Sequence, residues 1–240
     1  MIKVKNLTLA FGEKSLYKNA EFEIPDNKVT VISGTNGVGK TTLLKIMSGQ
    51  IKVSNAVVEN SFKEIFFLPQ NIRYPEGITL FEYITSSFFK NSFKWFLNDE
   101  EKRKAERVID ELELSDRRDV LIEKLSSGEL QKANIAMALA SDADCLFLDE
   151  PTSNMDLINQ IKIMNIIKKL TKRGITVVII MHDLNMASSY GDYFIGFNNK
   201  NDIIKAEKNK FFTEENLEKI FGIKFKVVKY DKDFHIQIFN

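Results

Sequence analysis

The sequence predicts an α/β fold that combines a parallel sheet with an antiparallel β-edge subdomain and an inserted helical subdomain. Short apolar runs at 29–33, 144–148 and 175–181 are typical of buried parallel strands. The first 24 residues alternate between apolar and polar side chains, as a half-exposed antiparallel sheet does. Residues 78–125 are rich first in aromatic and then in charged side chains, which indicates a helical insert.

In chain order, we expect a β-hairpin over 2–24 with its turn at 12–14, a strand at 29–33, and a helix from Lys40 to Ser48 that ends at Gly49. Helices are expected at 100–112 and 157–172, a short helix after Thr213, and a terminal hairpin with its turn at 231–233. Residues 1–240 then form one domain. Its core comprises 1–75 and 141–240, with a C-terminal β extension, and its helical subdomain comprises 76–140.

The composition is that of a globular protein with nearly balanced charge. The 240 residues include 34 Lys and Arg against 33 Asp and Glu, a net charge of +1, and 44% are hydrophobic. This balance argues against a protein that binds nucleic acid by charge alone. The single cysteine, Cys145, cannot form an internal disulfide, which fits a reducing compartment. No apolar run reaches the roughly 18 residues of a membrane span, and the first residues lack the apolar core of a secretory signal.

The segment from Gly34 to Thr41 fits the pattern G-x-x-x-x-G-K-[ST] and lies between a predicted strand and a predicted helix. Glycines let such a loop curl so that its backbone N–H groups point at a phosphate, and the helix N-terminus adds positive charge. Lys40 is placed to neutralise the β- and γ-phosphates, Thr41 to bind Mg²⁺ and Thr42 to touch the α-phosphate. The motif therefore predicts a P-loop NTPase core whose ATP-binding residues include Gly34, Asn36, Gly37, Gly39, Lys40, Thr41 and Thr42.

Two acids, Asp149 and Glu150, end the apolar run that begins at Cys145. Asp149 is placed to hold Mg²⁺ and Glu150 to polarise an attacking water. An acid pair after a strand is often only a helix cap or a solvated turn, and the P-loop upstream is what favours the metal. Cys145, inside an apolar strand, is expected in the core.

The segment Leu125-Ser126-Ser127-Gly128-Glu129 resembles the Leu-Ser-Gly-Gly-Gln signature of ATP-binding cassette (ABC) ATPases. Other motifs of that family follow in the expected order over almost the whole chain. Gln70 resembles the Q-loop glutamine, Ser153-Asn154-Met155-Asp156 resembles the D-loop, and His182 resembles the switch histidine. Phe11 matches the aromatic residue that stacks on adenine.

The resemblance implies that Ser126 and Gly128 bind the γ-phosphate of ATP held by a second cassette, so that each site needs two chains. It implies that Gln70 contacts Mg²⁺ or the attacking water, and that His182 contacts the γ-phosphate and orders Glu150. The implied catalytic residues are Glu150, His182 and Gln70, and the implied Mg²⁺ ligands are Thr41, Gln70 and Asp149. Ser127 stands where the family usually has glycine, which puts the rate of turnover in doubt more than the function. His235 is expected to be structural.

The resemblance also implies partners. We expect a homodimer of ATPase subunits, transmembrane permease subunits, an extracytoplasmic substrate-binding protein that acts indirectly, and no nucleic acid. The expected location is the cytoplasmic face of a prokaryotic cell membrane. Most of the aromatic side chains of the insert are expected to fill its own small core, and some to be left over; these are Phe81, Tyr83, Phe88, Phe89, Phe93, Trp95 and Phe96. We expect Tyr83, Phe88 or Phe89 to border a groove for a short permease helix.

The segments 181–187 and 211–223 resemble the C-terminal half of importer ATPases for iron chelates and cobalamin. This resemblance implies a metal chelate as the transported substrate, whether iron-siderophore, haem or cobalamin. Three alternatives stay open: an ATPase of a zinc, manganese or other ABC transporter, a soluble ABC ATPase acting on DNA, ribosomes or Fe–S assembly, and a non-catalytic regulatory cassette. The third is disfavoured because Lys40, Asp149, Glu150 and His182 are all present.

Overall fold

A six-stranded sheet forms the centre of the computed structural model, which describes residues 1–11, 14–89, 96–198 and 202–239, without the side chains of Phe11 and Lys14. The strands lie in the order β5-β6-β7-β3-β8-β9, and all neighbours are parallel except β8 and β9. Their bounds are β5 Ile65–Leu68, β6 Cys145–Asp149, β7 Thr176–Ile180, β3 Val29–Gly34, β8 Tyr193–Phe197 and β9 Ile203–Glu207. Every residue of β3, β6 and β7 is buried, as expected of central parallel strands.

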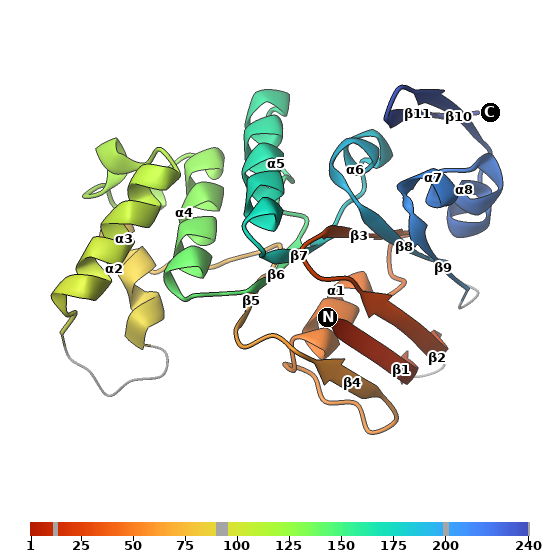
Figure 1. Ribbon diagram of the computed structural model, residues 1–240, viewed down its shortest axis with the longest axis horizontal. Helices are drawn as coiled ribbons and strands as arrows, with labels where there is room; N and C mark the ends of the chain where they lie inside the picture. The colour runs from red at the N-terminus through yellow and green to blue at the C-terminus, as the bar shows by residue number, and fades with distance from the viewer. Residues whose placement is uncertain (12–13, 90–95, 199–201, 240) are drawn as a thin grey trace.

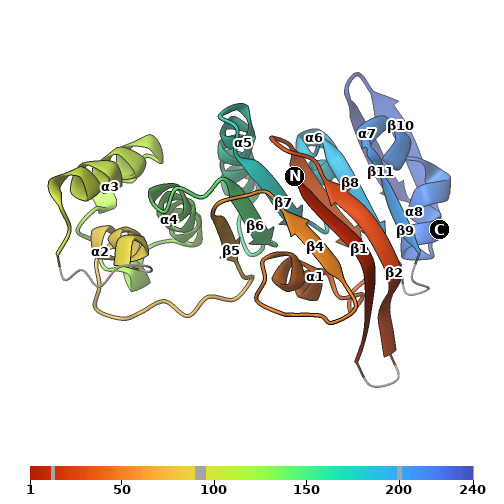
Figure 2. The same cartoon turned by 60° about the horizontal axis from the view of Figure 1, so that its bottom comes forward.

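The two faces of this sheet pack against different layers. Alternate strand residues such as Leu146 and Ile179 share one core cluster with Ile163 of α5 (Leu157–Lys172). Phe147 and Ile180 point the other way, into a second cluster with Leu43 of α1 (Lys40–Met47). Figures 1 and 2 show α1 between the six-stranded sheet and an antiparallel sheet of β2 (Lys14–Ile24), β1 (Ile2–Phe11) and β4 (Val57–Asn60).

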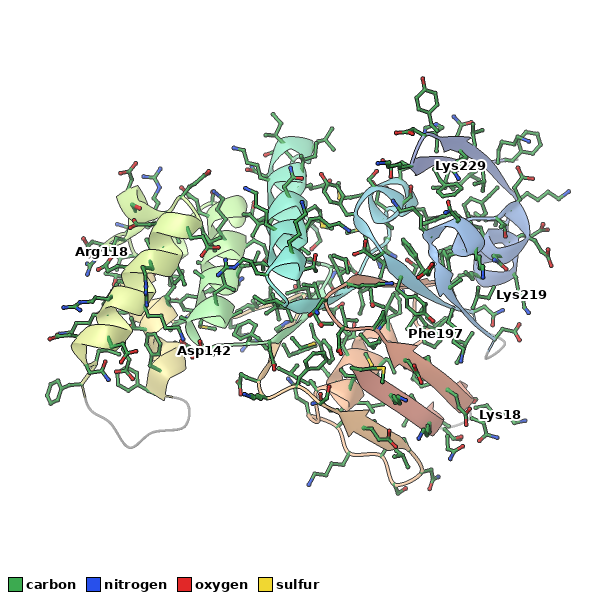
Figure 3. All side chains as sticks on the ribbon, in the orientation of Figure 1. Lys18, Arg118, Asp142, Phe197, Lys219 and Lys229 are labelled. Carbon is green, nitrogen blue, oxygen red and sulfur yellow. The ribbon has the colours of Figure 1, made fainter. Side chains whose placement is uncertain are left out.

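Phe197, at the end of β8, joins the antiparallel sheet to the central one. Its ring makes edge contacts with Tyr17 and Phe22 of β2, at centroid distances of 5.5 and 6.1 Å. Figure 3 labels Phe197 at this junction. The contact fixes β2 beside the loop that follows β3, which matters for the site described below.

A helical insert occupies the chain between β5 and β6. It contains α2 (Leu80–Thr85), η1 (Ser86–Phe89), α3 (Asp99–Glu111), η2 (Ser115–Arg117), η3 (Ile122–Lys124) and α4 (Ser127–Ala140). Each of its three α-helices begins with a capping box, formed by Thr79 with Glu82, Asn98 with Glu101, and Ser126 with Glu129. These caps satisfy N–H groups that the first helical turn leaves without intrahelical partners.

The C-terminal part adds α6 (Leu184–Tyr190), α7 (Lys208–Phe211), α8 (Glu214–Phe221) and a hairpin of β10 (Phe225–Tyr230) and β11 (Asp233–Ile238). The hairpin is held on α6 because the Ser188 hydroxyl donates to the Phe234 carbonyl and the Asn185 amide donates to the Ile236 carbonyl. None of the helices in the described ranges has the length and hydropathy needed to cross a bilayer.

The predicted fold class is confirmed, and so are the helices predicted at 40–48, 100–112 and 157–172. The strands β4 and β5 were not predicted, because neither four-residue segment alternates clearly. Cys145 is fully buried, as expected. Phe93 and Trp95 lie outside the described residues, as do positions 12 and 13 of the predicted first turn. Of the three residues expected to border an exposed groove, Tyr83 is excluded, because its side chain is only 7% exposed and packs inside the insert, whereas the expectation for Phe88 or Phe89 stays a prediction.

Candidate functional site

The glycine-rich loop leaves β3 and leads into α1 with a backbone that only glycine accommodates at two positions. Gly34 has φ of 150°, and a Cβ there would lie 2.2 Å from the carbonyl oxygen of Phe197. Gly39 has φ of 93° and precedes α1, where a Cβ would lie 2.8 Å from the hydroxyl oxygen of Tyr17. The Tyr17 hydroxyl donates to the Gly39 carbonyl at 2.7 Å, so β2 supports the loop from behind. No feature of the sequence pointed to Tyr17, because its partner lies 22 residues away.

Lys40, the first residue of α1, is buried under this loop with 7% of its surface exposed. Its ammonium donates to the carbonyl oxygens of Gly34 at 2.9 Å and Thr35 at 3.0 Å. Burial lowers the pKa of Lys40, while the charges of Glu150 and Asp149 oppose that shift. The cation therefore lies against the loop, at the N-terminus of a helix, where an anion is favoured.

Asp149 ends β6 beside the N-terminus of α1. The Thr41 hydroxyl donates to its Oδ2 at 2.7 Å, whereas the buried Oδ1 has no hydrogen-bond partner among the described residues. Burial raises the pKa of this carboxyl, which is 3% exposed. A buried carboxylate oxygen beside a threonine hydroxyl fits a Mg²⁺ site, since Mg²⁺ takes one or two protein carboxylates together with substrate phosphates.

Glu150 is held by residues that follow the two strands on either side of its own. The Gln70 amide, two residues beyond β5, donates to Glu150 Oε2 at 2.7 Å. His182 Nε2, two residues beyond β7, lies 2.7 Å from Glu150 Oε1. Because β5, β6 and β7 are adjacent and parallel, their carboxyl ends bring these three side chains together. Glu150 itself has φ of 51°, a left-handed conformation that non-glycine residues rarely adopt.

Ser126 caps α4, in the insert, and takes part in a compact polar cluster. The Glu129 carboxylate accepts from the Ser126 backbone N–H and hydroxyl, each at 2.8 Å, and from Arg117 at 2.6 Å. The hydrogen bond from Arg117, with those from Ser126, lowers the pKa of Glu129 to about 2. Gly128 is packed against α5, where a Cβ would lie 3.2 Å from the side chain of Asn159.

The structure brings only some of the predicted site residues together. Lys40, Thr41, Asp149, Glu150, Gln70 and His182 form one connected group. The hydrogen bonds of Ser126 and the close contact of Gly128, within the described residues, go to the insert and to α5 instead. Figure 1 shows α4 beside α2 and α3, across α5 from β3 and α1. Asn36 and Gly37 are exposed on the loop and Thr42 is half-buried, whereas the Phe11 side chain lies outside the described part.

Fold and site together are those of a P-loop nucleotide-binding protein, and the comparisons with known proteins narrow this class. The chain matches the family model described as "ABC transporter" over residues 17–153. The iron(3+)-hydroxamate import ATP-binding protein FhuC of Bacillus subtilis is 30% identical over 95% of this chain and 90% of its own length. The manganese transport system ATP-binding protein MntB of Listeria monocytogenes is 31% identical over 92% of this chain and 96% of its own length.

Solved structures show the same fold. One, described as an inward-facing conformation of a metal-chelate type ABC transporter, has a TM-score of 0.89 and 24% identity over 100% of this chain and 97% of that one. An ABC transporter cassette in its ADP conformation has a TM-score of 0.80 and 22% identity over 91% of this chain and 96% of that one. The chain therefore belongs to the ABC transporter family, in which it is the ATP-binding and ATP-hydrolysing subunit.

Proposed function

We propose that two copies of this chain bind and hydrolyse ATP to drive import of a metal chelate through a separate membrane permease. The observation that carries the catalytic part is the pair of 2.7 Å contacts that hold both carboxylate oxygens of Glu150, one from Gln70 and one from His182. A carboxylate oriented in this way is suited to accept a proton from an attacking water. A metal chelate is favoured because relatives similar over nearly the whole chain are named for import or transport of iron(3+)-hydroxamate, petrobactin and ferric enterobactin.

Each residue of the connected group is then assigned a role in the binding or hydrolysis of ATP. Backbone N–H groups of residues 34–39 and the ammonium of Lys40 bind the phosphates. Thr41, Asp149 and Gln70 would hold Mg²⁺, which supplies positive charge against the phosphate oxygens. Glu150 takes the proton of the attacking water, and His182 orients Glu150 and contacts the γ-phosphate. We assign adenine stacking to Phe11.

Ser126 and Gly128 act on the ATP of the second copy. Two features support this assignment. Their hydrogen bonds and close contacts lie in the insert and on α5. Leu157, Ile158 and Ile161, just after the predicted D-loop, are 64%, 68% and 40% exposed, an apolar surface that a second chain would cover. ATP that binds only the closed dimer favours closure, by about 2.7 kcal/mol per site at 100 times its Kd.

The helical insert, residues 76–140, is proposed as the subdomain that moves against the core formed by 1–75 and 141–240. The permease would dock on the insert near Phe88 and Phe89, which places the chain on the cytoplasmic face of the membrane. An extracytoplasmic binding protein would deliver substrate without touching this chain, and nucleic acid has no part in the cycle.

A Glu150→Gln variant tests the catalytic assignment. Loss of the general base is expected to lower turnover by about 10²–10⁴-fold, while ATP binding and ATP-driven dimer formation remain. Turnover is measured by phosphate release and dimer formation by size-exclusion chromatography with and without ATP. Undiminished hydrolysis would refute the role of Glu150, and an absent dimer would refute the shared site.

Isolation of the chain from native membranes in mild detergent tests the transport part. A polytopic permease and a metal-chelate-binding protein are expected to co-purify. A free-metal importer is the second candidate, because the manganese transport relative is as similar as the siderophore ones. Substrate-stimulated ATPase activity of the isolated complex, measured with iron chelates and with Mn²⁺ or Zn²⁺, decides between them. Ribosomal or nucleic-acid partners in place of a permease would refute both.

A further inference from the structure

A buried polar cluster lies inside the helical insert, away from the nucleotide site. Asn134, on α4, is 1% exposed, and its Oδ1 accepts from the Tyr83 hydroxyl at 2.7 Å. Its Nδ2 donates to the Tyr74 hydroxyl at 2.9 Å, and the two tyrosine rings lie 5.7 Å apart. Burial raises the pKa of both tyrosines, so their hydroxyl groups stay protonated.

The cluster joins three segments of different secondary structure. Tyr74 lies in the stretch 69–79, which contains neither helix nor strand, at the fourth position after Gln70. Tyr83 lies on α2, and Asn134 lies eight residues beyond Ser126 on the helix that Ser126 caps. Four residues span at most about 14 Å, and eight helical residues span about 12 Å. A short path therefore runs from Glu150 through its hydrogen bond to Gln70, along the backbone to Tyr74, and through the hydrogen bond of Tyr74 with Asn134 to α4.

The amide side chain of Asn134 does more than fill space in the core of the insert. Its neighbours on α4, Ala133, Ile135 and Ala136, are buried apolar residues of the core cluster. A leucine at 134 would have the same branched skeleton, with two methyl groups in place of polar atoms that have to be desolvated. Only a side chain with both a donor and an acceptor can join one tyrosine hydroxyl to another as this amide does. The polar side chain therefore fixes one register between the 69–79 segment and α4.

We propose that Asn134, with Tyr74 and Tyr83, is a positioning residue that makes Gln70 and the Ser126 end of α4 move together. Release of Gln70 from Glu150 would then be tied to the orientation that α4 presents to the second copy. This inference rests on the proposed function, because it assigns Gln70 to one ATP site and Ser126 to the other. The nucleotide affinity of the single chain does not depend on the cluster, whereas turnover by the dimer does.

Variants that remove one hydroxyl test this proposal in the purified 240-residue chain. Tyr74→Phe and Tyr83→Phe keep the rings, and Asn134→Leu removes both hydrogen bonds. Tyr193→Phe is the control, since it removes a hydroxyl from β8, on the far side of the sheet from β5. Coupling energies between sites correspond to about 5–150-fold effects, so at least about a five-fold lower kcat is expected for the three cluster variants. Binding of a fluorescent ATP analogue to the single chain should change less than two-fold.

Two outcomes would overturn the proposal, and circular dichroism first shows which variants are folded. A wild-type kcat in Tyr74→Phe and Tyr83→Phe overturns the proposal. Equal losses of kcat and of nucleotide affinity also overturn it, because they indicate general damage to the fold. If Asn134→Leu does not fold, the two phenylalanine variants decide alone. Failure of the proposed function has a different signature, because the unaltered chain would then fail to hydrolyse ATP.

Discussion

Replacement of Asp149 by asparagine should stabilise the nucleotide-free protein while it destroys its activity. The carboxyl group is 3% exposed, and its Oδ1 has no hydrogen-bond partner among the described residues. Its pKa is raised by burial, so the fold favours the neutral form of this side chain. An asparagine retains a carbonyl oxygen for the Thr41 hydroxyl but carries no charge to desolvate.

The magnitude follows from the buried charge. The asparagine NH₂ would be as unpartnered as Oδ1, so the variant removes only the excess cost of a buried charge over that of a neutral polar atom, which is about 1–3 kcal/mol, and the attraction of Lys40 offsets part of this excess. Neutralisation should therefore stabilise the fold by about 1–2 kcal/mol, or about 2–8 °C in Tm for a chain of this size. A raised folded-state pKa means that the contribution of Asp149 to stability falls as pH rises above the ordinary value of 3.8. The advantage of Asp149→Asn should thus vanish near pH 3 and be fully present at pH 7.

Thermal unfolding at pH 3, 5 and 7, with and without Mg·ATP, measures this effect. Mg·ATP should reverse the order, because the natural chain gains binding energy through Asp149 that the variant lacks. The control is Asp144→Asn, where the carboxylate accepts from the backbone N–H groups of Lys63 and Glu64. This control should lose stability. An Asp149→Asn protein that is less stable than the natural one without nucleotide at pH 7 would show that the reasoning is wrong.

Three further substitutions have defined outcomes. Tyr17→Phe removes one of the two hydrogen bonds that the Gly39 carbonyl accepts, the other coming from the Leu43 N–H. This loss should cost about 1 kcal/mol in urea unfolding and weaken ATP binding several-fold by calorimetry, and unchanged affinity would count against a supporting role. Gly128→Ala pushes against Asn159 and should suppress the ATP-driven dimer in chromatography, whereas an unaltered dimer would contradict the shared site. Glu129→Gln loses the ion pair with Arg117 and should cost about 0.5–1 kcal/mol at pH 7. Because the pKa of Glu129 is lowered to about 2, this difference should shrink as pH falls from 4.5 towards 2, and a constant difference would refute it.

The sequence predicted the parts of the site that a local pattern determines. The position of the glycine-rich loop, between a buried strand and the helix that begins at Lys40, could be predicted because glycine spacing and helix propensity depend on only a few neighbouring residues. Asp149 and Glu150 were placed at a strand end for the same reason. The strand order is a non-local property, so the meeting of Gln70, Glu150 and His182 followed only from the family resemblance. The structure supplies the physical cause, which is that β6 lies between β5 and β7.

Residues that act through distant partners were beyond prediction from the sequence. Tyr17 reads as one more aromatic residue in an alternating strand, and only the fold brings it to the P-loop. Tyr83 reads as a surface aromatic of the insert, and the structure buries it against Asn134, 51 residues away. In both cases a tyrosine hydroxyl forms a hydrogen bond that joins two elements far apart in the sequence.

Gln70 and His182, the two residues that contact Glu150, differ in how firmly the fold holds them in place. A water molecule that is to lose a proton to Glu150 must approach one of its carboxylate oxygens, and each of these already has one hydrogen-bond contact and a second lone pair. His182 follows a fully buried strand and precedes Asp183, which caps α6, so its position is fixed by the core. Gln70 belongs to a stretch without helix or strand that is tied, through Tyr74, to the helical insert. Under the proposed mechanism Gln70 is therefore the partner that gives up its contact with Glu150 Oε2 to water. Movement of the insert on closure of the dimer is what breaks this contact.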